Sequence, residues 1–235
     1  MTAATHPHTP GPPALPYPTT SRTVNQAMQI RKLKVEGAYE FTPRQFRDHR
    51  GLFVSPFQLE AFQQALGRPH FPVAQTNHSL SRRGTIRGIH FTVTPPGTAK
   101  YVYCARGRAL DIVVDLRVGS PTFRQWDAVE MDQVHFRASY FPVGVGHAFV
   151  ALEDDTVMSY LLTGPYVAEN ELAVDVFDKD LGVRIPSGLD TVQSDRDAAA
   201  LSFASARAQG LLPDYAESLA VEEALWQPSG IGATR

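Results

Sequence analysis

The sequence predicts an all-β protein, built as a sandwich or a barrel of short strands. Segments rich in β-branched and aromatic residues recur along residues 29–177, at intervals of about 8–12 residues. Gly, Pro, Asp or Asn separates them, as in the turns that join short strands. No Gly-rich phosphate loop occurs, and strands do not alternate with long helices, which argues against a doubly wound α/β sheet.

The expected strands can be placed one by one from apolar–polar alternation or from short apolar runs. They cover 29–35, 39–42, 48–57 (a turn that leads into a strand), 73–81, 86–94, 101–105, 109–117, 126–131, 137–142, 148–152, 156–162 and 172–177. Two short helices are expected: 59–66, which ends at Gly67, and 202–209, which Gly210 and Pro213 follow. Beyond Asp178 the pattern is otherwise irregular, and the last residues are expected to fray.

Composition excludes several classes of protein. The chain has 235 residues, of which 43% are hydrophobic and 20% charged, as in an ordinary globular domain. A net charge of −2 gives no electrostatic reason to expect nucleic acid or an acidic membrane as a partner. The single cysteine, Cys104, excludes an internal disulfide and fits a reducing compartment. Because the sequence also lacks a membrane-spanning run and a signal-peptide pattern, we expect a cytoplasmic protein.

Three regions differ in texture. Residues 1–26 are rich in Pro, Thr and Ala, and proline removes backbone donors, so we expect a disordered tail there. Residues 27–185 carry the expected strands and form the predicted domain. Residues 186–235 are expected to be a C-terminal extension with a short helix.

The stretch from Gly84 to Lys100 is the first candidate site. His90 follows Arg87 by three residues and precedes Lys100 by ten, with a Pro-Pro-Gly turn in between. On a regular strand Arg87 and His90 would lie on opposite faces, but Gly88 between them can mark a bulge that brings them to one face. A lone histidine on an apolar strand is often a core residue, whereas the two flanking cations favour a functional one.

Two further segments carry polar residues in a pattern. Gln75, Asn77 and Ser79 alternate along one side of an expected strand, which predicts either a solvent face or the wall of a polar cavity. Arg50, in the Asp-His-Arg-Gly turn, is either a surface charge or a donor to an anionic ligand.

Two spacings resemble the short motifs of the cupins, jelly-roll β-barrels with a ligand site inside. One is Gly84, five residues and then His90; the other is Pro-x-Gly-x-x-His, ending at His147. The resemblance implies a cupin jelly-roll barrel with short peripheral helices. Metal-binding cupins carry a second histidine where this chain has Thr92, and no Glu follows in 92–102. Two imidazoles without a carboxylate are too few for a tight metal site, so we expect no metal and no cofactor.

A closer resemblance covers about residues 29–215. The chain is similar to the dTDP-4-dehydrorhamnose 3,5-epimerases and their 3-epimerase relatives of deoxysugar biosynthesis. The matching segments are DHRGLF (48–53), QTNHS (75–79), IRGIHF (86–91), PPGTAKYV (95–102), DIVVDLRVGSPTF (111–123), PVGVGHAF (142–149) and FDKDLGV (177–183). Two positions depart from the family pattern. Ser55 stands where a Glu is usual, and Gly146-His147-Ala148 replaces Ala-His-Gly.

This resemblance implies a set of site residues. It makes His90 the catalytic base, Asp178 the aspartate paired with it and Tyr160 the acid on the other side of the sugar. Lys100 is implied as a cation at the keto oxygen. The implied substrate-binding residues are Arg50, Phe53, Gln75, Asn77, Arg87 and His147, and for His147 the choice between lining the cavity and bracing the barrel is open.

The implied activity is inversion at C3, alone or with C5, of a dTDP-linked 4-keto-6-deoxyhexose. Two alternatives stay open: a 3,4-ketoisomerase of the same nucleotide sugar, and a sugar-nucleotide binding module without catalysis. The resemblance also implies a homodimer in which an N-terminal strand of one subunit joins the sheet of the other, with Arg50 and Phe53 serving the partner's site.

Overall fold

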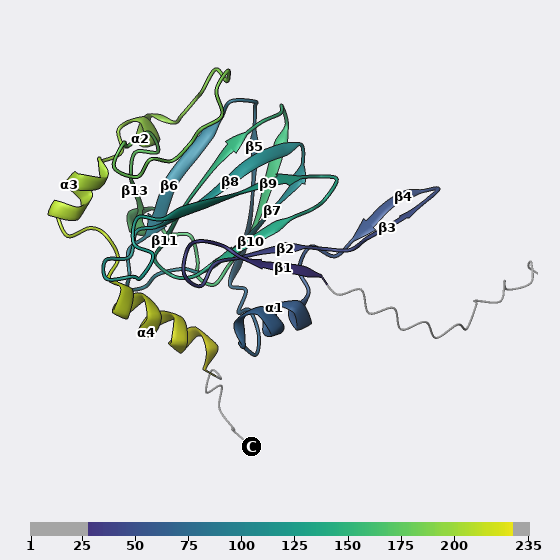
Figure 1. The fold of residues 1–235 in the computed structure, drawn as a ribbon, viewed down its shortest axis with the longest axis horizontal. Coiled ribbons are helices and arrows are strands. Elements are labelled where there is room, and N and C mark those ends of the chain that lie inside the picture. Colours follow the sequence, from purple (N-terminus) through teal and green to yellow (C-terminus); the bar gives the residue numbers. More distant parts are fainter. Residues whose placement is uncertain (1–27, 228–235) are drawn as a thin grey trace, which may run out of the picture.

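A computed structural model describes residues 28–227, which form two antiparallel β-sheets packed face to face and a separate hairpin (Figure 1). The six-stranded sheet runs, from edge to edge, β1 (Gln29–Lys32), β2 (Tyr39–Thr42), β10 (Ala138–Phe141), β7 (Lys100–Arg106), β12 (Thr156–Leu162) and β5 (Gln75–Ser81). The five-stranded sheet runs β13 (Glu171–Ala173), β6 (Ile86–Thr92), β11 (Val145–Ala151), β8 (Arg108–Asp115) and β9 (Trp126–Asp132).

This arrangement confirms the all-β class and the jelly-roll type of sandwich. Within residues 28–227 the two sheets do not merge into one closed barrel. Most expected strands appear within a few residues of their predicted bounds, whereas the last one shortens to Glu171–Ala173. The predicted tail, residues 1–26, lies outside the described residues.

Successive side chains of a strand point to opposite faces, so apolar residues form one core between the sheets and a further cluster on the outer face of each sheet. On β7, Val102 and Cys104 point between the sheets, while Tyr101 and Tyr103 point outward. The outward tyrosines join an aromatic cluster with Phe62 that covers the six-stranded sheet. The outer face of the five-stranded sheet packs against residues from 174–212. An apolar layer therefore covers the outer face of each sheet.

Two expected helices are confirmed. Helix α1 (Leu59–Leu66) ends at Gly67, whose positive φ of 67° is the left-handed conformation that favours glycine. Helix α3 (Phe203–Ala208) packs Phe203 and Ala206 on the five-stranded sheet. A one-turn 3₁₀-helix (Ala168–Asn170) leads into β13. No helix within residues 28–227 is long and apolar enough to cross a membrane.

Two further helices were not expected. They are α2 (Asp195–Ala198) and α4 (Tyr215–Trp226), and the prediction of frayed last residues is wrong as far as Trp226. The buried stripe of α4 consists of Ser218, Glu222 and Trp226, so polar residues hide its helical period. The phenol of Tyr140 donates to Glu222 at 2.6 Å, which satisfies the buried carboxylate.

The hairpin of β3 (Gln45–Asp48) and β4 (Gly51–Val54) projects from the rest of the molecule (Figure 1). It is a sheet of its own. The turn that leads into a strand, predicted at 48–57, is confirmed as the turn of this hairpin and β4, whereas β3 was not expected. Phe46 and Phe53 on it are 50% and 68% exposed. An isolated two-stranded hairpin with exposed aromatic side chains is marginally stable without further contacts.

Candidate active site

A cavity of about 500 Å³ opens between the two sheets. Strands of both sheets contribute to its wall. Eight residues singled out from the sequence line it: Gln75, Asn77, Ser79, Arg87, His90, Lys100, His147 and Tyr160. The polar face expected on the strand at 73–81 is therefore the wall of a cavity.

A bulge in β6 places Arg87 and His90 in the same cavity. His90 pairs with His147 of β11, but Arg87 pairs with Phe149, so three steps on β6 face two steps on β11. The extra residue lies between Arg87 and His90, in the step that contains Gly88, as the sequence suggested. Gly88 has a φ of 105°, and a Cβ there would lie 2.3 Å from the carbonyl oxygen of His147. Only glycine fits this position without displacement of the backbone.

His90 forms a pair with Asp197. Its Nε2 lies 2.6 Å from Oδ1 of Asp197, and Oδ2 of the same carboxylate accepts from the backbone N–H of Gly88 at 3.4 Å. Asp197 is buried, whereas the His90 side chain is 29% exposed and faces the cavity. Burial alone would raise the pKa of Asp197, but the hydrogen bond and charge of His90 outweigh it and leave that pKa below its ordinary value. One ring nitrogen of His90 is thus anchored, and the other is left to take a proton.

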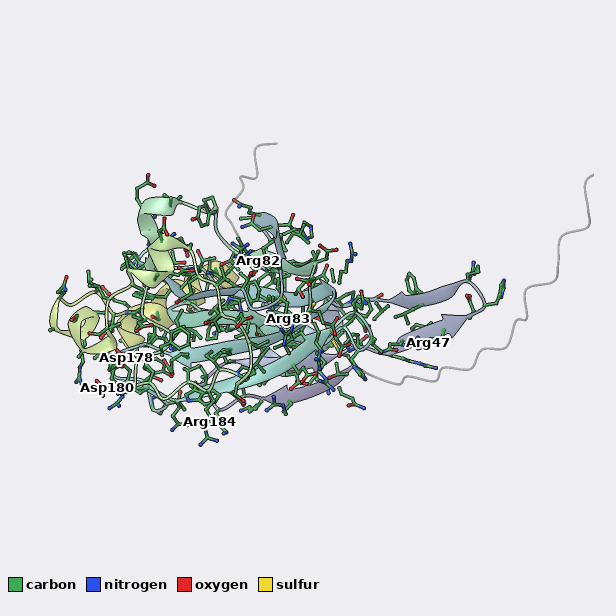
Figure 2. All side chains as sticks on the ribbon, turned by 90° about the horizontal axis from the view of Figure 1, so that it is seen from above. Arg47, Arg82, Arg83, Asp178, Asp180 and Arg184 are labelled. Carbon is green, nitrogen blue, oxygen red and sulfur yellow. The ribbon has the colours of Figure 1, made fainter. Side chains whose placement is uncertain are left out.

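The expected pairing of Asp178 with His90 does not occur. Oδ2 of Asp178 accepts from the backbone N–H of Phe203, and Oδ1 accepts from that of Asp180. These bonds tie the turn at 178–182 to the first residue of α3. Figure 2 shows Asp178 beside Asp180 on the side of the molecule away from the projecting hairpin. Its carboxylate therefore serves the turn, and Asp197 takes the place beside the histidine.

Tyr160 reaches the cavity from the other sheet. It lies on β12 between Asn77 of β5 and Val102 of β7, and its hydroxyl is 3.5 Å from Oγ of Ser79. Burial is the main reason why the pKa of this phenol is raised well above its ordinary value. The phenol thus stays protonated over the ordinary pH range, on the sheet across the cavity from the one that carries His90.

Lys100 brings a buried positive charge. Its Nζ lies 3.7 Å from Oε2 of Glu171 on β13, and both side chains are largely buried. The other oxygen, Oε1, accepts from the hydroxyl of Thr92 at 2.8 Å. Burial lowers the pKa of the Lys100 ammonium, and the charge and hydrogen bond of Glu171 oppose that shift.

His147 lines the cavity and is also held in the protein interior. The two alternatives for it, lining the cavity and bracing the barrel, therefore both apply. Its Nε2 lies 2.5 Å from Oδ1 of Asp111 on β8, and its ring stacks on Phe141 with centroids 4.7 Å apart. The other oxygen of Asp111 is buried without a hydrogen-bond partner. A carboxylate on the inward face of an apolar strand was the available signal for this pair in the sequence.

Arg50 and Phe53 do not line the cavity. Both lie on the projecting hairpin, where the Arg50 guanidinium pairs with Asp48 at 2.6 Å. The Arg50 side chain is 79% exposed, so this pair contributes little to stability. Within one chain, Arg50 and Phe53 therefore lie away from the other residues expected to bind the substrate.

No cluster of three or more His, Cys, Asp or Glu residues that could hold a metal ion occurs in residues 28–227. Thr92 occupies the position of the missing second histidine and bonds Glu171 through its hydroxyl. The polar groups near His90 therefore pair with one another: Asp197 with His90, and Thr92 with Glu171.

The family model described as dTDP-4-dehydrorhamnose 3,5-epimerase matches residues 32–205. The chain belongs to this family. Among its relatives, the dTDP-4-dehydrorhamnose 3-epimerase of Streptomyces niveus is 44% identical over 205 residues, which are 87% of this chain and 98% of the relative. The dTDP-4-dehydrorhamnose 3,5-epimerase of Streptomyces griseus is 46% identical over 197 residues, 83% and 97% of the two chains.

A solved structure agrees with the epimerase fold described above. The 3'-monoepimerase ChmJ from Streptomyces bikiniensis, crystallised with dTDP-quinovose, superposes with a TM-score of 0.79 at 43% identity and covers 83% of this chain and 97% of its own. Relatives named 3-epimerase and 3,5-epimerase are thus about equally similar to this epimerase, and overall identity does not separate inversion at C3 from inversion at C3 and C5.

Proposed function

We propose that the protein inverts C3, alone or together with C5, of a dTDP-linked 4-keto-6-deoxyhexose for deoxysugar biosynthesis. The observation that carries this proposal is that His90 on one sheet, paired with Asp197 of α2, and the Tyr160 phenol on the other sheet line one cavity. A base and an acid on two walls can remove a proton from one face of a sugar carbon and return one to the opposite face.

The chemistry follows from the substrate's ketone. His90 takes the proton from the carbon next to the ketone, and the electron pair of the C–H bond forms an enolate with its charge on the C4 oxygen. Asp197 stabilises the imidazolium that results. Tyr160 then donates its proton to the same carbon from the other side, which restores the ketone with the configuration inverted.

Acid–base catalysis alone does not account for such a reaction. Positioned proton transfer contributes about 10²–10⁴-fold, whereas enzymes accelerate reactions by about 10⁶-fold or more. The enolate therefore needs stabilisation, and Lys100 and Arg87 bring positive charge to the cavity wall. In a site shielded from water, such charges act more strongly than in solution.

The proposal is tested by NMR of dTDP-4-keto-6-deoxyglucose in D₂O with the protein and with His90→Asn. We expect deuterium and inversion at C3 with the unaltered chain, and neither with His90→Asn, because the amide cannot take the proton. Deuterium at C5 as well would establish double epimerisation. Transfer of the keto group from C4 to C3 would establish a ketoisomerase, and tight binding of the nucleotide sugar without exchange would leave a binding module.

The projecting hairpin supports the expected homodimer, which we include in the proposal. Phe46 and Phe53 expose apolar surface on a two-stranded sheet that pairs with no other strand within residues 28–227, and β1 is an edge strand. A second subunit can cover this surface and receive Arg50 and Phe53 in its cavity.

We also propose a cytoplasmic location, because the single cysteine, Cys104, is a buried free thiol, as expected in a reducing compartment.

Co-expression of two inactive variants distinguishes a hairpin that serves the partner's site from one that serves its own. One variant carries His90→Asn and the other carries Arg50→Ala with Phe53→Ala. In a mixed dimer, exchange of hairpins leaves one site with both defects and the other with none. Because subunits of a symmetric dimer combine at random, we expect about one quarter of full activity in the mixture. Activity no higher than that of the separate variants, from a preparation shown to contain mixed dimers, would contradict exchange.

A further inference from the structure

We propose that Glu171 is a positioning residue that keeps the Lys100 ammonium charged and in place at the cavity wall, and that Thr92 orients Glu171 for this task. The inference rests on the proposed function, since it assigns Lys100 to the enolate oxygen. It goes beyond that function because neither Glu171 nor Thr92 has a part in the proton transfers.

The contacts of Glu171 fix it on three sides. Its backbone pairs with Thr92 across β13 and β6, and its Oε1 accepts from the Thr92 hydroxyl at 2.8 Å. The Arg196 guanidinium of α2 donates to its backbone carbonyl. Oε2 is left to face Lys100 at 3.7 Å. A carboxylate held this firmly pays little conformational entropy for the ion pair.

The surroundings of Lys100 make this carboxylate decisive. Among the described residues that line the cavity, Glu171 has the only carboxylate. The other ionisable groups that line the cavity are Arg87 and His90 of β6, His147 of β11, Tyr160 of β12, His78 of β5 and Tyr166. Two further carboxylates, Asp111 and Asp197, contact these histidines from behind the cavity wall. Asp111 is already paired with His147, and Asp197 with His90. The remaining groups are cationic or neutral, so Glu171 is the one described residue that compensates for burial of the ammonium.

The sign of the effect follows from this arrangement. Burial lowers the pKa of Lys100, and Glu171 counteracts it. Removal of the carboxylate therefore lowers that pKa further, so that Lys100 loses its proton at a lower pH. A neutral amine stabilises an enolate far less than an ammonium does. The loss of activity should accordingly grow as pH rises, and it should fall mainly on kcat.

The first test observes Lys100 directly. The sequence contains four lysines, Lys32, Lys34, Lys100 and Lys179, so protein labelled with ¹⁵N-lysine gives few side-chain signals, which Lys100→Arg assigns. In Glu171→Gln we expect the titration midpoint of Lys100 to move to lower pH by about one unit or more, as loss of a close opposite charge does. The other three lysines should titrate as before. An unmoved Lys100 midpoint would overturn the proposal, and this result does not depend on whether the protein is an epimerase.

The second test measures kcat and KM for C3 inversion across pH. Loss of one donor to a developing oxyanion costs about 10²–10³-fold in kcat, so partial neutralisation of Lys100 in Glu171→Gln should cost about 10-fold at pH 8 and less at pH 6. Thr92→Val should act in the same direction, and Thr92→Ser, which keeps the hydroxyl, should stay closer to the unaltered chain. In a Lys100→Ala background, Glu171→Gln should have no further effect on kcat.

The outcomes separate this inference from the proposed function. If the unaltered protein performs no exchange, the proposed function fails while the lysine titration still tests the pair. If the protein is active but Glu171→Gln raises KM alone, with the pH profile of kcat unchanged, Glu171 is a substrate contact and the inference is wrong. An equal loss of kcat at every pH would likewise overturn it.

Discussion

Replacing Asp197 with Asn should lower kcat by about 10³–10⁴-fold, the loss typical of a histidine base whose carboxylate partner becomes an amide. The Asp197 carboxylate accepts from Nε2 of His90 and from the backbone N–H of Gly88. An amide can turn its NH₂ group toward the ring, which favours the wrong tautomer, and it has no charge to stabilise the imidazolium. The measurement is the rate of C3 inversion at saturating substrate, with folding checked by thermal unfolding.

Asp178→Asn is the matched control. The Asp178 carboxylate accepts from the backbone N–H groups of Asp180 and Phe203, one on each oxygen, and an Asn can still accept one of them with its remaining oxygen. We expect kcat close to that of the unaltered chain and at most a small loss of stability. The reverse result, with Asp178→Asn inactive and Asp197→Asn active, would show that the base depends on the turn aspartate.

The misassigned aspartate shows where sequence reasoning reached its limit. His90 and Asp197 are 107 residues apart, and no local period connects a strand to a one-turn helix. The sequence does contain a sign of that helix. Ser194 is followed three residues later by Asp197, and its hydroxyl accepts from the backbone N–H of Asp197, as in a helix cap. This spacing can locate a helix start but says nothing about what its carboxylate touches.

The strands were predictable because alternation depends only on neighbours in the sequence. Gln75 and Asn77 were expected on one face, and they do line one wall. The bulge at Gly88 was expected from a glycine within a strand, because an extra residue needs a backbone that glycine supplies. Local rules therefore found the wall residues on β5 and β6.

The carboxylates that complete the site depend on pairing between distant strands. Glu171 comes to Lys100 only because β13 pairs with β6, and Asp111 comes to His147 only because β8 pairs with β11. Asp111 was visible as a charge within the apolar run at 109–117, which demanded a buried partner. That the partner is His147 could not be predicted without the register of β8 against β11.

Tyr160→Phe should separate proton exchange from inversion. Without the phenol, His90 can still remove the C3 proton and return a deuteron to the same face, because enolate formation needs only the base and the cations. We expect the substrate to gain deuterium at C3 with its configuration retained, while inversion falls by about 10²–10⁴-fold, the usual contribution of a positioned acid. ¹H NMR in D₂O reports both quantities in one sample, since the C3 signal disappears on exchange and the product gives its own signals on inversion.

Tyr103→Phe is the control for loss of a phenol from the same sheet, because Tyr103 packs on the outer aromatic layer and not in the cavity. It should leave exchange and inversion unchanged. If Tyr160→Phe instead loses exchange and inversion to the same extent, the phenol takes part in removing the proton, and the assignment of base and acid to opposite walls is wrong. Retention of both activities would mean that the second proton comes from water. Only exchange without inversion is consistent with His90 and Tyr160 working on opposite faces of one carbon, since each residue then controls the proton on its own side.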